Sequence, residues 1–160
     1  MPAEPGLHAH PDDLEAVRAW FRALEGYVNA LDFKGSYHLT HEDFLAFGTF
    51  ADFVVGREEA EKNQWRKVWP TISDFHFRPD IRALVSPDRL FAVGLAVFDS
   101  TGYNEDNSTF TRSGRATVTF DRKKIGDPWM ANHSHMSLLR GIPQVSHGKR
   151  QPPPDGGPEA

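Results

Sequence analysis

The order of apolar and polar residues predicts a long amphipathic helix near the start of the chain. Apolar residues recur every three or four positions from Leu14 to Leu31, which places them on one side of a helix with 3.6 residues per turn. Asp12 precedes this stripe and Glu15 follows three residues later, which is the spacing of a helix-capping box. The pattern therefore predicts that the folded part begins at residue 12 with a helix.

Two shorter helices are predicted to follow. Thr40 can cap a helix over residues 40–48, which has apolar residues on one side and ends at a glycine. After Gly56, a run rich in Glu and Lys begins a third helix, which must end before Pro70.

From residue 72 the apolar period changes to two, which predicts β-strands. Turn-forming sequences separate four such segments, at residues 72–85, 90–98, 108–120 and 128–140. Three helices followed by four strands joined as hairpins predict an α+β fold, in which the helices cover one face of an antiparallel sheet.

Length and composition narrow the organisation of the chain. Its 160 residues suffice for one domain, which we place at residues 12–144. Residues 1–11 are predicted to form a flexible tail, and residues 145–160, which are rich in proline and glycine, a disordered one. The net charge of −4 provides no basic field for binding a nucleic acid.

The residue types that the sequence lacks exclude further classes of protein and of functional site. The chain has no cysteine, which excludes disulfide scaffolds, thiolate zinc sites and cysteine nucleophiles. No apolar run is long enough to span a membrane, and the first residues do not resemble a secretion signal. We therefore expect a cytoplasmic protein with no membrane partner.

Four segments of the sequence form an ordered set: FLAFGT at 44–49, VVGRE at 54–58, GRATVTF at 114–120 and WMANHSHMS at 129–137. This set, which covers roughly residues 12–144, resembles the SnoaL-like branch of the superfamily that holds nuclear transport factor two and ketosteroid isomerase. The resemblance implies a cone-shaped α+β barrel, in which a strongly curved sheet wraps around helices and encloses a deep pocket. It also implies a dimer. It does not imply one activity, because this fold hosts isomerases, cyclases, dehydratases, epoxide hydrolases, an association hub and transport factors.

The two long C-terminal strands decide which side chains reach such a pocket. In residues 108–120 the even-numbered positions are mostly apolar, which favours burial of that face against the helices. In the last strand the resemblance places Asn132, Ser134 and Met136 toward the pocket. The expected lining consists of Tyr27, Phe47, Trp65, Trp69, Phe91, Val93, Leu95, Arg112, Asn132, Ser134 and Met136.

Arg112 is the most informative of these residues. A cation within an apolar set must meet an anion, a carboxylate or water. One hypothesis is that Arg112 clamps a carboxylate, phosphate or enolate oxygen of a substrate. The alternatives are a salt bridge to Asp52 or Glu105, or an outward turn of the side chain at Gly114.

Three further residues are candidates for catalysis. Tyr27 lies where the resemblance to ketosteroid isomerase places an oxyanion-hole tyrosine, although it could also pack at the helix edge. The resemblance implies a base aspartate near residues 47–49, but none stands there, and Val118 occupies the place of a second aspartate. Steroid isomerase chemistry is therefore not expected. Asp52 and His76 remain as candidate bases, and a solvent-facing position is the alternative for His76.

His133 and His135 have a spacing that can supply two metal ligands. A third ligand would have to come from the neighbouring strand, where the candidates are Arg115 and Thr117. We therefore predict no metal and no other cofactor. The pair faces either the pocket or the dimer side of the sheet, where the rings would bond to threonine or serine hydroxyls. The same segment partly resembles the ending of iota-class carbonic anhydrases, from which Met136 departs.

Two hypotheses of function remain. The first is a cofactor-independent, SnoaL-like enzyme that binds a small hydrophobic carbonyl or carboxylate compound and catalyses proton transfer, as in isomerisation, cyclisation or dehydration. The second is a non-catalytic module that holds a ligand or associates with other chains. The missing base favours the second hypothesis, and Arg112 favours the first. Both predict a small-molecule ligand and a homodimer formed through the threonine-rich face of the sheet.

Overall fold

The long first helix is present as predicted. The computed structural model describes residues 9–48 and 52–152. Helix α1 spans Pro11–Ala30, and the Asp12 amide donates to His10 Nδ1 at 3.1 Å, so the side chain of His10 caps the helix. The buried side of α1 carries Val17, Trp20, Phe21, Leu24 and Val28. Residues 1–8 of the predicted tail lie outside the described ranges.

The second predicted helix is wrong. Residues Gly35–Leu39 form a short 3₁₀ helix, η1, and Thr40–Phe47 form strand β1. Strand β1 pairs with β2 (Phe53–Val55) and with the last strand of the chain. Burial alternates along residues 44–47, as in a half-buried strand, and pairing with a distant segment outweighs the local helix signals.

The third predicted helix is confirmed as a helical run that changes its winding. It consists of α2 (Arg57–Ala60), a π-helical turn η2 (Glu61–Trp65), α3 (Arg66–Val68) and the 3₁₀ turn η3 (Trp69–Thr71). A π turn inserts an extra residue into the helix and rotates the side chains that follow. No helix in the described ranges has both the length and the apolar character needed to cross a bilayer.

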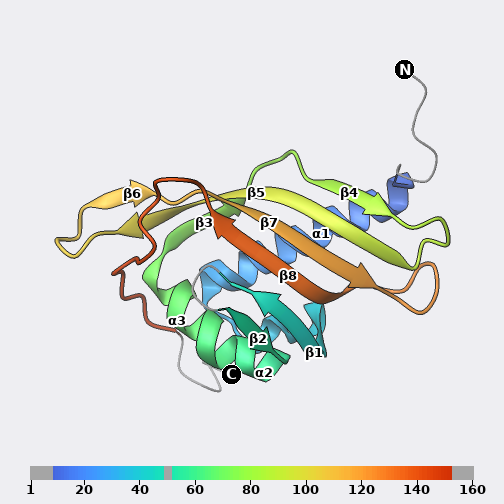
Figure 1. Cartoon of the computed structure of the whole chain (residues 1–160), viewed down its shortest axis with the longest axis horizontal. Helices are drawn as coiled ribbons and strands as arrows, with labels where there is room; N and C mark the ends of the chain where they lie inside the picture. The colour runs from blue at the N-terminus through green and yellow to red at the C-terminus, as the bar shows by residue number, and fades with distance from the viewer. Residues whose placement is uncertain (1–8, 49–51, 153–160) are drawn as a thin grey trace.

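The strands form one curved sheet against α1 (Figure 1). Beyond β1 and β2 the described chain contains β3 (Ser73–Phe77), β4 (Arg82–Val85), β5 (Phe91–Tyr103), β6 (Thr109–Thr111), β7 (Gly114–Asp121) and β8 (Met130–Leu138). The order is β2-β1-β8-β7-β5-β3, and both β4 and β6 pair with β5. The expected segment 108–120 is thus interrupted, but Arg112 and Ser100 still exchange two backbone hydrogen bonds, so the pairing with β5 keeps its register.

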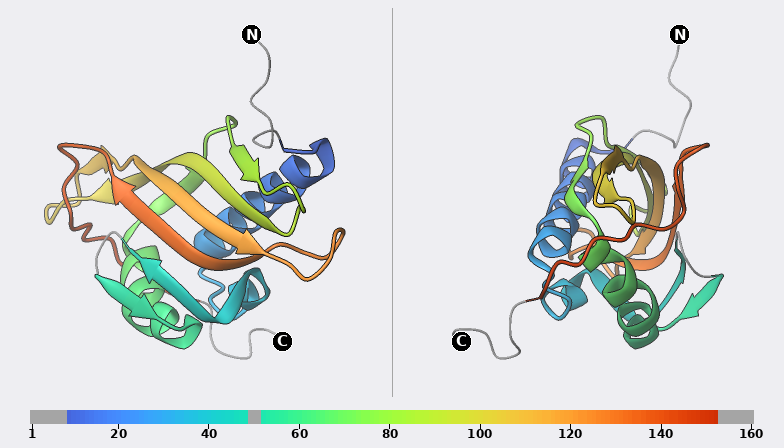
Figure 2. Two further views of the ribbon diagram at one scale, coloured as in Figure 1. Left: turned by 45° about the vertical axis from the view of Figure 1, so that its right-hand side comes forward. Right: turned by 90° about the vertical axis from the view of Figure 1, so that its left-hand side faces the viewer.

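The α+β fold with helices on a curved sheet is confirmed, with two corrections. The sheet is mixed rather than antiparallel, because β1 runs parallel to β8. The sheet is also open, because β2 and β3 end the strand order without pairing with each other. Figure 2 shows how the sheet curls around α1. We call the face toward α1 the inner face and the opposite one the outer face.

The C-terminal segment folds back onto the domain. Residues 139–152, which we call the C-terminal strap, run back across the end of α1 and η3 (Figure 2). The Arg150 guanidinium donates to the backbone oxygens of Asn29 at 2.7 Å, Trp69 at 2.9 Å and Ile72 at 2.5 Å. Residues 145–152 are thus held against the rest of the domain by one arginine, which donates to backbone oxygens near the ends of α1 and η3.

Candidate functional site

A cavity of about 80 Å³ lies between α1, the helical run 57–71 and the inner face of the sheet. Its wall is mostly apolar, as is usual for small-molecule sites. The apolar lining comes from Trp20, Leu24, Val28, Leu39, Phe44, Ala46, Phe47, Ala60, Trp65, Val68, Trp69, Ile72, Phe75, Phe98 and Met136, together with Gly48. The polar lining residues are Ser36, Thr40, Gln64, Arg112 and Ser134.

Stacked aromatic rings form one wall of the cavity. The rings of Trp65 and Trp69 lie 5.3 Å apart at 16°, and the ring of Phe33 stacks on Trp69 at 5.0 Å. The guanidinium of Arg66 lies over the Phe33 ring at 4.4 Å. Rings fixed in this way offer a flat face to a planar ligand.

Arg112 is the charged residue among the described lining residues. Its backbone pairing with Ser100 directs the side chain to the inner face, where the residue is only 3% exposed. Burial lowers the pKa of its guanidinium to about 10, so the group remains a cation at neutral pH. A buried cation in an apolar chamber is suited to an anionic or carbonyl oxygen of a ligand.

No family model and no curated protein matches this sequence. Solved structures do match its fold. A ketosteroid isomerase-like protein from Erwinia carotovora atroseptica aligns with a TM-score of 0.68 at 15% identity, over 81% of this chain and 98% of the other. A nuclear transport factor 2-like superfamily protein from Salmonella enterica aligns with a TM-score of 0.67 at 14% identity, over 86% and 99%.

A third match is the CaMKII hub from S. rosetta, with a TM-score of 0.64 at 15% identity, over 87% of this chain and 100% of the hub. The chain has the nuclear transport factor 2-like fold. Similarity at these identities shows the shape of the chain, and the activity has to be argued from the residues of its own cavity.

The nuclear transport factor 2-like fold of this chain brings several predicted residues together. Among the residues predicted from sequence, the cavity lining contains Phe47, Trp65, Trp69, Arg112, Ser134 and Met136. They come from four separate parts of the chain: β1, the helical run, the segment between β6 and β7, and β8. The grouping follows from curling the sheet over the helices, which turns the even-numbered residues of β7 and the end of β8 inward.

Other predicted lining residues lie elsewhere. Phe91, Val93 and Leu95 belong to the outer face, and the small residues between them face α1. A side chain at Gly94 would place its Cβ 2.7 Å from the ring of Phe21, so the inner face of β5 has room only for a glycine at this position. Both faces of this strand are apolar, and the sequence pattern therefore did not distinguish them.

Asn132 is also outside the cavity. The pairs Thr119–His133 and Phe120–Ala131 show that β8 carries one extra residue at this point, which is a β-bulge. Asn132 is that residue, and its side chain bonds to Thr119 and, at 3.0 Å, to Asp121 Oδ2. Alternation along β8 therefore holds only from the bulge onward, where Ser134 and Met136 face inward.

The remaining catalytic candidates do not assemble into one site. The Tyr27 hydroxyl bonds to His38 Nε2 at 2.7 Å in an exposed position, and Asp52 is exposed ahead of β2. Neither residue lines the cavity, and neither does His76. The cavity lining in the described ranges therefore contains Arg112 without these three residues.

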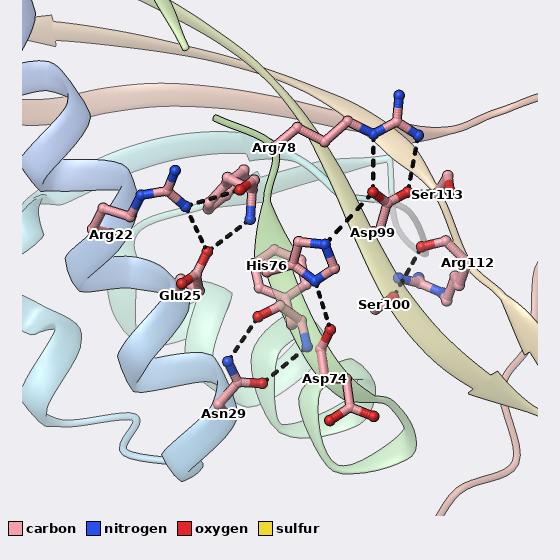
Figure 3. A network of polar contacts seen from close by, with 12 residues as sticks. Arg22, Glu25, Asn29, Asp74, His76, Arg78, Asp99, Ser100, Arg112 and Ser113 are labelled. Carbon is pink, nitrogen blue, oxygen red and sulfur yellow. Dashed lines mark hydrogen bonds and ion pairs between the residues drawn. The ribbon is translucent and has the colours of Figure 1, made fainter. Parts of the chain in front are cut away.

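His76 belongs to a surface network around Asp99 (Figure 3). Arg78 donates to both carboxylate oxygens of Asp99 at 2.9 and 3.0 Å, and Ser113 donates to Oδ1. These partners, with Arg78 first, lower the pKa of Asp99 to about 2. The Asp99 carboxylate thus accepts hydrogen bonds from Arg78 and Ser113, and His76 Nε2 lies 3.7 Å from it.

The histidine pair of β8 lies on the outer face. His133 Nδ1 is 2.7 Å from the backbone oxygen of Leu45, and the ring of Phe47 lies 5.7 Å from His133 and 5.3 Å from His135. The pair therefore packs beside strand β1.

Sequence reasoning missed three polar residues of the lining, Ser36, Thr40 and Gln64. Thr40 was assigned to a helix cap, but it begins strand β1. Gln64 lies in the π turn, which lets it face the cavity together with the adjacent Trp65. Regular helical spacing separates neighbouring residues by about 100°, and no sequence signal announces a π turn.

Proposed function

We propose that this protein binds a small, largely apolar molecule in the cavity and that Arg112 holds an anionic or carbonyl oxygen of that molecule. The single observation that carries this proposal is the position of Arg112, a buried cation in a chamber lined mainly by apolar side chains. The stacked wall of Trp65 and Trp69 favours a planar or aromatic body for the ligand.

The lining favours binding over proton-transfer catalysis. General acid–base catalysis needs a group that exchanges a proton near neutral pH, usually an imidazole or a carboxylate. The described lining residues include neither of these groups. Arg112 can stabilise negative charge on an oxygen, but with a pKa of about 10 it stays protonated. We therefore propose ligand binding as the function, with catalysis by isomerisation, cyclisation or dehydration as the less supported hypothesis.

Replacing Arg112 with methionine tests this proposal. We expect 2-naphthoate to bind the wild-type protein and to bind Arg112→Met about 10- to 100-fold more weakly, because a hydrogen bond to a charged group contributes about 1.5–3 kcal/mol. Isothermal titration calorimetry measures the dissociation constants. The control is Arg115→Met, which removes an exposed arginine three residues further along the chain, on the outer face of β7.

The control variant should bind 2-naphthoate like the wild type. Equal affinities of Arg112→Met and wild type for 2-naphthoate would contradict the assigned role of Arg112. Failure of the wild-type protein to bind 2-naphthoate and benzoate at millimolar concentration would contradict the proposed cavity function.

We also propose that two copies of the chain associate through the outer face. Leu84 on β4 and Phe91 on β5 are 41% and 43% exposed there, and Val93 lies opposite Leu84 in the strand pairing. Large apolar side chains grouped on a sheet face are typical of an interface. Similarity to the CaMKII hub is in keeping with association, although it extends to the fold alone.

Light scattering tests this association. We expect the wild-type protein to have the mass of a dimer at micromolar concentration and the double variant Leu84→Asp, Phe91→Asp to have the mass of a monomer, because two buried charges would oppose the contact. The control is Ile125→Asp, which adds a charge at a 54% exposed apolar residue in the loop between β7 and β8. A wild-type monomer, or a dimer that survives the double substitution, would contradict the proposal.

A further inference from the structure

Two side-chain oxygens of the cavity lining lack a hydrogen-bond partner within the described ranges: Thr40 Oγ1 and Gln64 Oε1. Thr40 is only 4% exposed. Buried polar atoms without partners are rare in proteins, because each of them has lost its bonds to bulk water. Both residues line the chamber that contains Arg112, so a rotation of either side chain would present its oxygen to a ligand held there.

The surroundings of Gln64 hold its amide in position. Glu61 begins the π turn as a buried carboxylate, which accepts from Arg66 Nε at 2.6 Å and from Lys34 Nζ at 3.0 Å. On the cavity side the Gln64 amide lies directly against Gly48, where an added Cβ would collide with it. The π turn is thus fixed from outside, while the amide occupies space that only a glycine at position 48 leaves open.

Thr40 is fixed through its backbone. Its amide donates to the backbone oxygen of Tyr37, and its own backbone oxygen accepts from Arg57 Nη1 at 3.0 Å. The hydroxyl group is the part of Thr40 that these contacts leave available. A hydroxyl group can donate or accept, whereas the carbonyl oxygen of a glutamine side chain can only accept.

We infer that the cavity selects ligands that carry a hydrogen-bond donor, an O–H or N–H group, for Gln64 Oε1, with Thr40 as a second partner. This inference rests on the proposed function. Arg112 donates, so the ligand needs an oxygen that accepts from it, and Gln64 accepts, so the ligand needs a group that donates. The chemical class that satisfies both is a hydroxylated or amino-substituted aromatic acid, whose ring lies in the apolar part of the chamber.

The cavity is expected to bind ligands with a donor group more tightly than ligands without one, because a ligand without a donor buries Gln64 Oε1 against an apolar surface. Sites that pair a ligand hydroxyl with a buried polar group reject analogues that lack the hydroxyl more strongly than apolar pockets reject a change of size. The comparison that isolates this effect is a hydroxyl group against fluorine at the same ring position, since fluorine is similar in size and does not donate.

The experiment measures dissociation constants of ring-hydroxylated 2-naphthoates, of the fluoro-2-naphthoates with the same substitution positions, and of 2-naphthoate itself. In the wild-type protein we expect at least one hydroxylated isomer to bind about tenfold or more tightly than its fluoro counterpart. In Gln64→Met, which keeps the length of the side chain but removes the carbonyl oxygen, this ratio should fall to about threefold or less.

Three further variants make the result specific. Gly48→Ala should lower the ratio as well, because the new methyl group displaces the Gln64 amide. Thr40→Val, which exchanges a hydroxyl for a methyl group, gives a test at the second oxygen if Gln64→Met does not fold. Asn63→Met is the matched control on the same turn, because Asn63 bonds to Glu59 and does not line the cavity.

The outcomes separate the inference from the proposed function. If no naphthoate shows binding that depends on Arg112, the proposed function is wrong. If 2-naphthoate binds through Arg112 but every hydroxylated isomer binds like its fluoro counterpart, the inference is wrong and the proposed function stands. A hydroxyl preference that persists unchanged in both Gln64→Met and Thr40→Val would also overturn the inference.

Discussion

Replacing Asp13 with alanine is expected to lower the free energy of unfolding by about 3–5 kcal/mol, the usual cost of removing one partner from a buried ion pair. The carboxylate is 2% exposed, and it accepts from Arg89 Nε at 2.7 Å and from Arg122 Nη2 at 2.8 Å. The side chain of Arg122 is itself 3% exposed and stacks on the ring of Trp129 at 3.9 Å. The substitution would leave this buried guanidinium without its carboxylate.

Urea unfolding followed by circular dichroism measures this loss of stability. The control is Asp12→Ala, which removes the neighbouring carboxylate in an exposed position. We expect that control to lose less than about 1 kcal/mol, the size of a helix-dipole contribution. Equal losses for the two variants would show that burial of the ion pair does not matter. The pKa of Asp13 is lowered, first by Arg89, so its stabilising contribution should decline as the pH falls below the ordinary range of an aspartate.

The second large effect is expected for Phe21→Ala, which should lower the free energy of unfolding by about 3–5 kcal/mol. The ring of Phe21 is completely buried and packs edge to face against Trp20 at 5.3 Å and Phe77 at 4.9 Å. It also lies against Gly94 on β5, where no side chain is available to fill the space that alanine would leave. The loss therefore combines the transfer of the ring to water with an open cavity.

Thermal and urea unfolding of Phe21→Ala should be compared with Ile125→Ala. Ile125 is a large apolar residue that is 54% exposed, and its truncation should change the free energy of unfolding by less than about 1 kcal/mol. A loss below about 2 kcal/mol for Phe21→Ala would mean that α1 and the sheet move together to close the space.

Local sequence patterns were sufficient to predict the elements that bury a single face. The stripe from Leu14 to Leu31 identified α1, because one side of that helix packs on the sheet and the other meets water. The even-numbered residues of β7 were assigned to the interior for the same reason. These predictions succeeded because a single buried face imposes its period on the sequence.

The prediction of a helix at residues 40–48 was wrong because the structure of β1 depends on a distant partner. The side chains of Phe44 and Phe47 have a spacing that a helix would also explain, and Thr40 is a common capping residue. Pairing with β8 makes this segment a strand instead of a helix, and β8 lies far away along the chain. Sequence periodicity carries no information about such a partner.

The candidate site was predicted in part for related reasons. Arg112, Trp65 and Trp69 line the cavity. Arg112 keeps the register of the pairing with β5, and the stacked rings of Trp65 and Trp69 lie four residues apart on the helical run. At Asn132 and Gln64, by contrast, a β-bulge and a π turn shift the phase of the side chains by one residue. Such insertions are decided by tertiary packing, and the residues involved have no distinctive type.

The parallel pairing of β1 with β8 has a consequence for how the chain reaches its native state. His133 contacts the backbone of Leu45, a residue 88 positions earlier. The β1–β2 pair can therefore join the rest of the sheet only after β8 has left the ribosome, so most of the chain is synthesised before β1 meets this partner. Chains dominated by such distant contacts fold in milliseconds to seconds rather than microseconds, because the entropy of a long loop is lost before the contacts form.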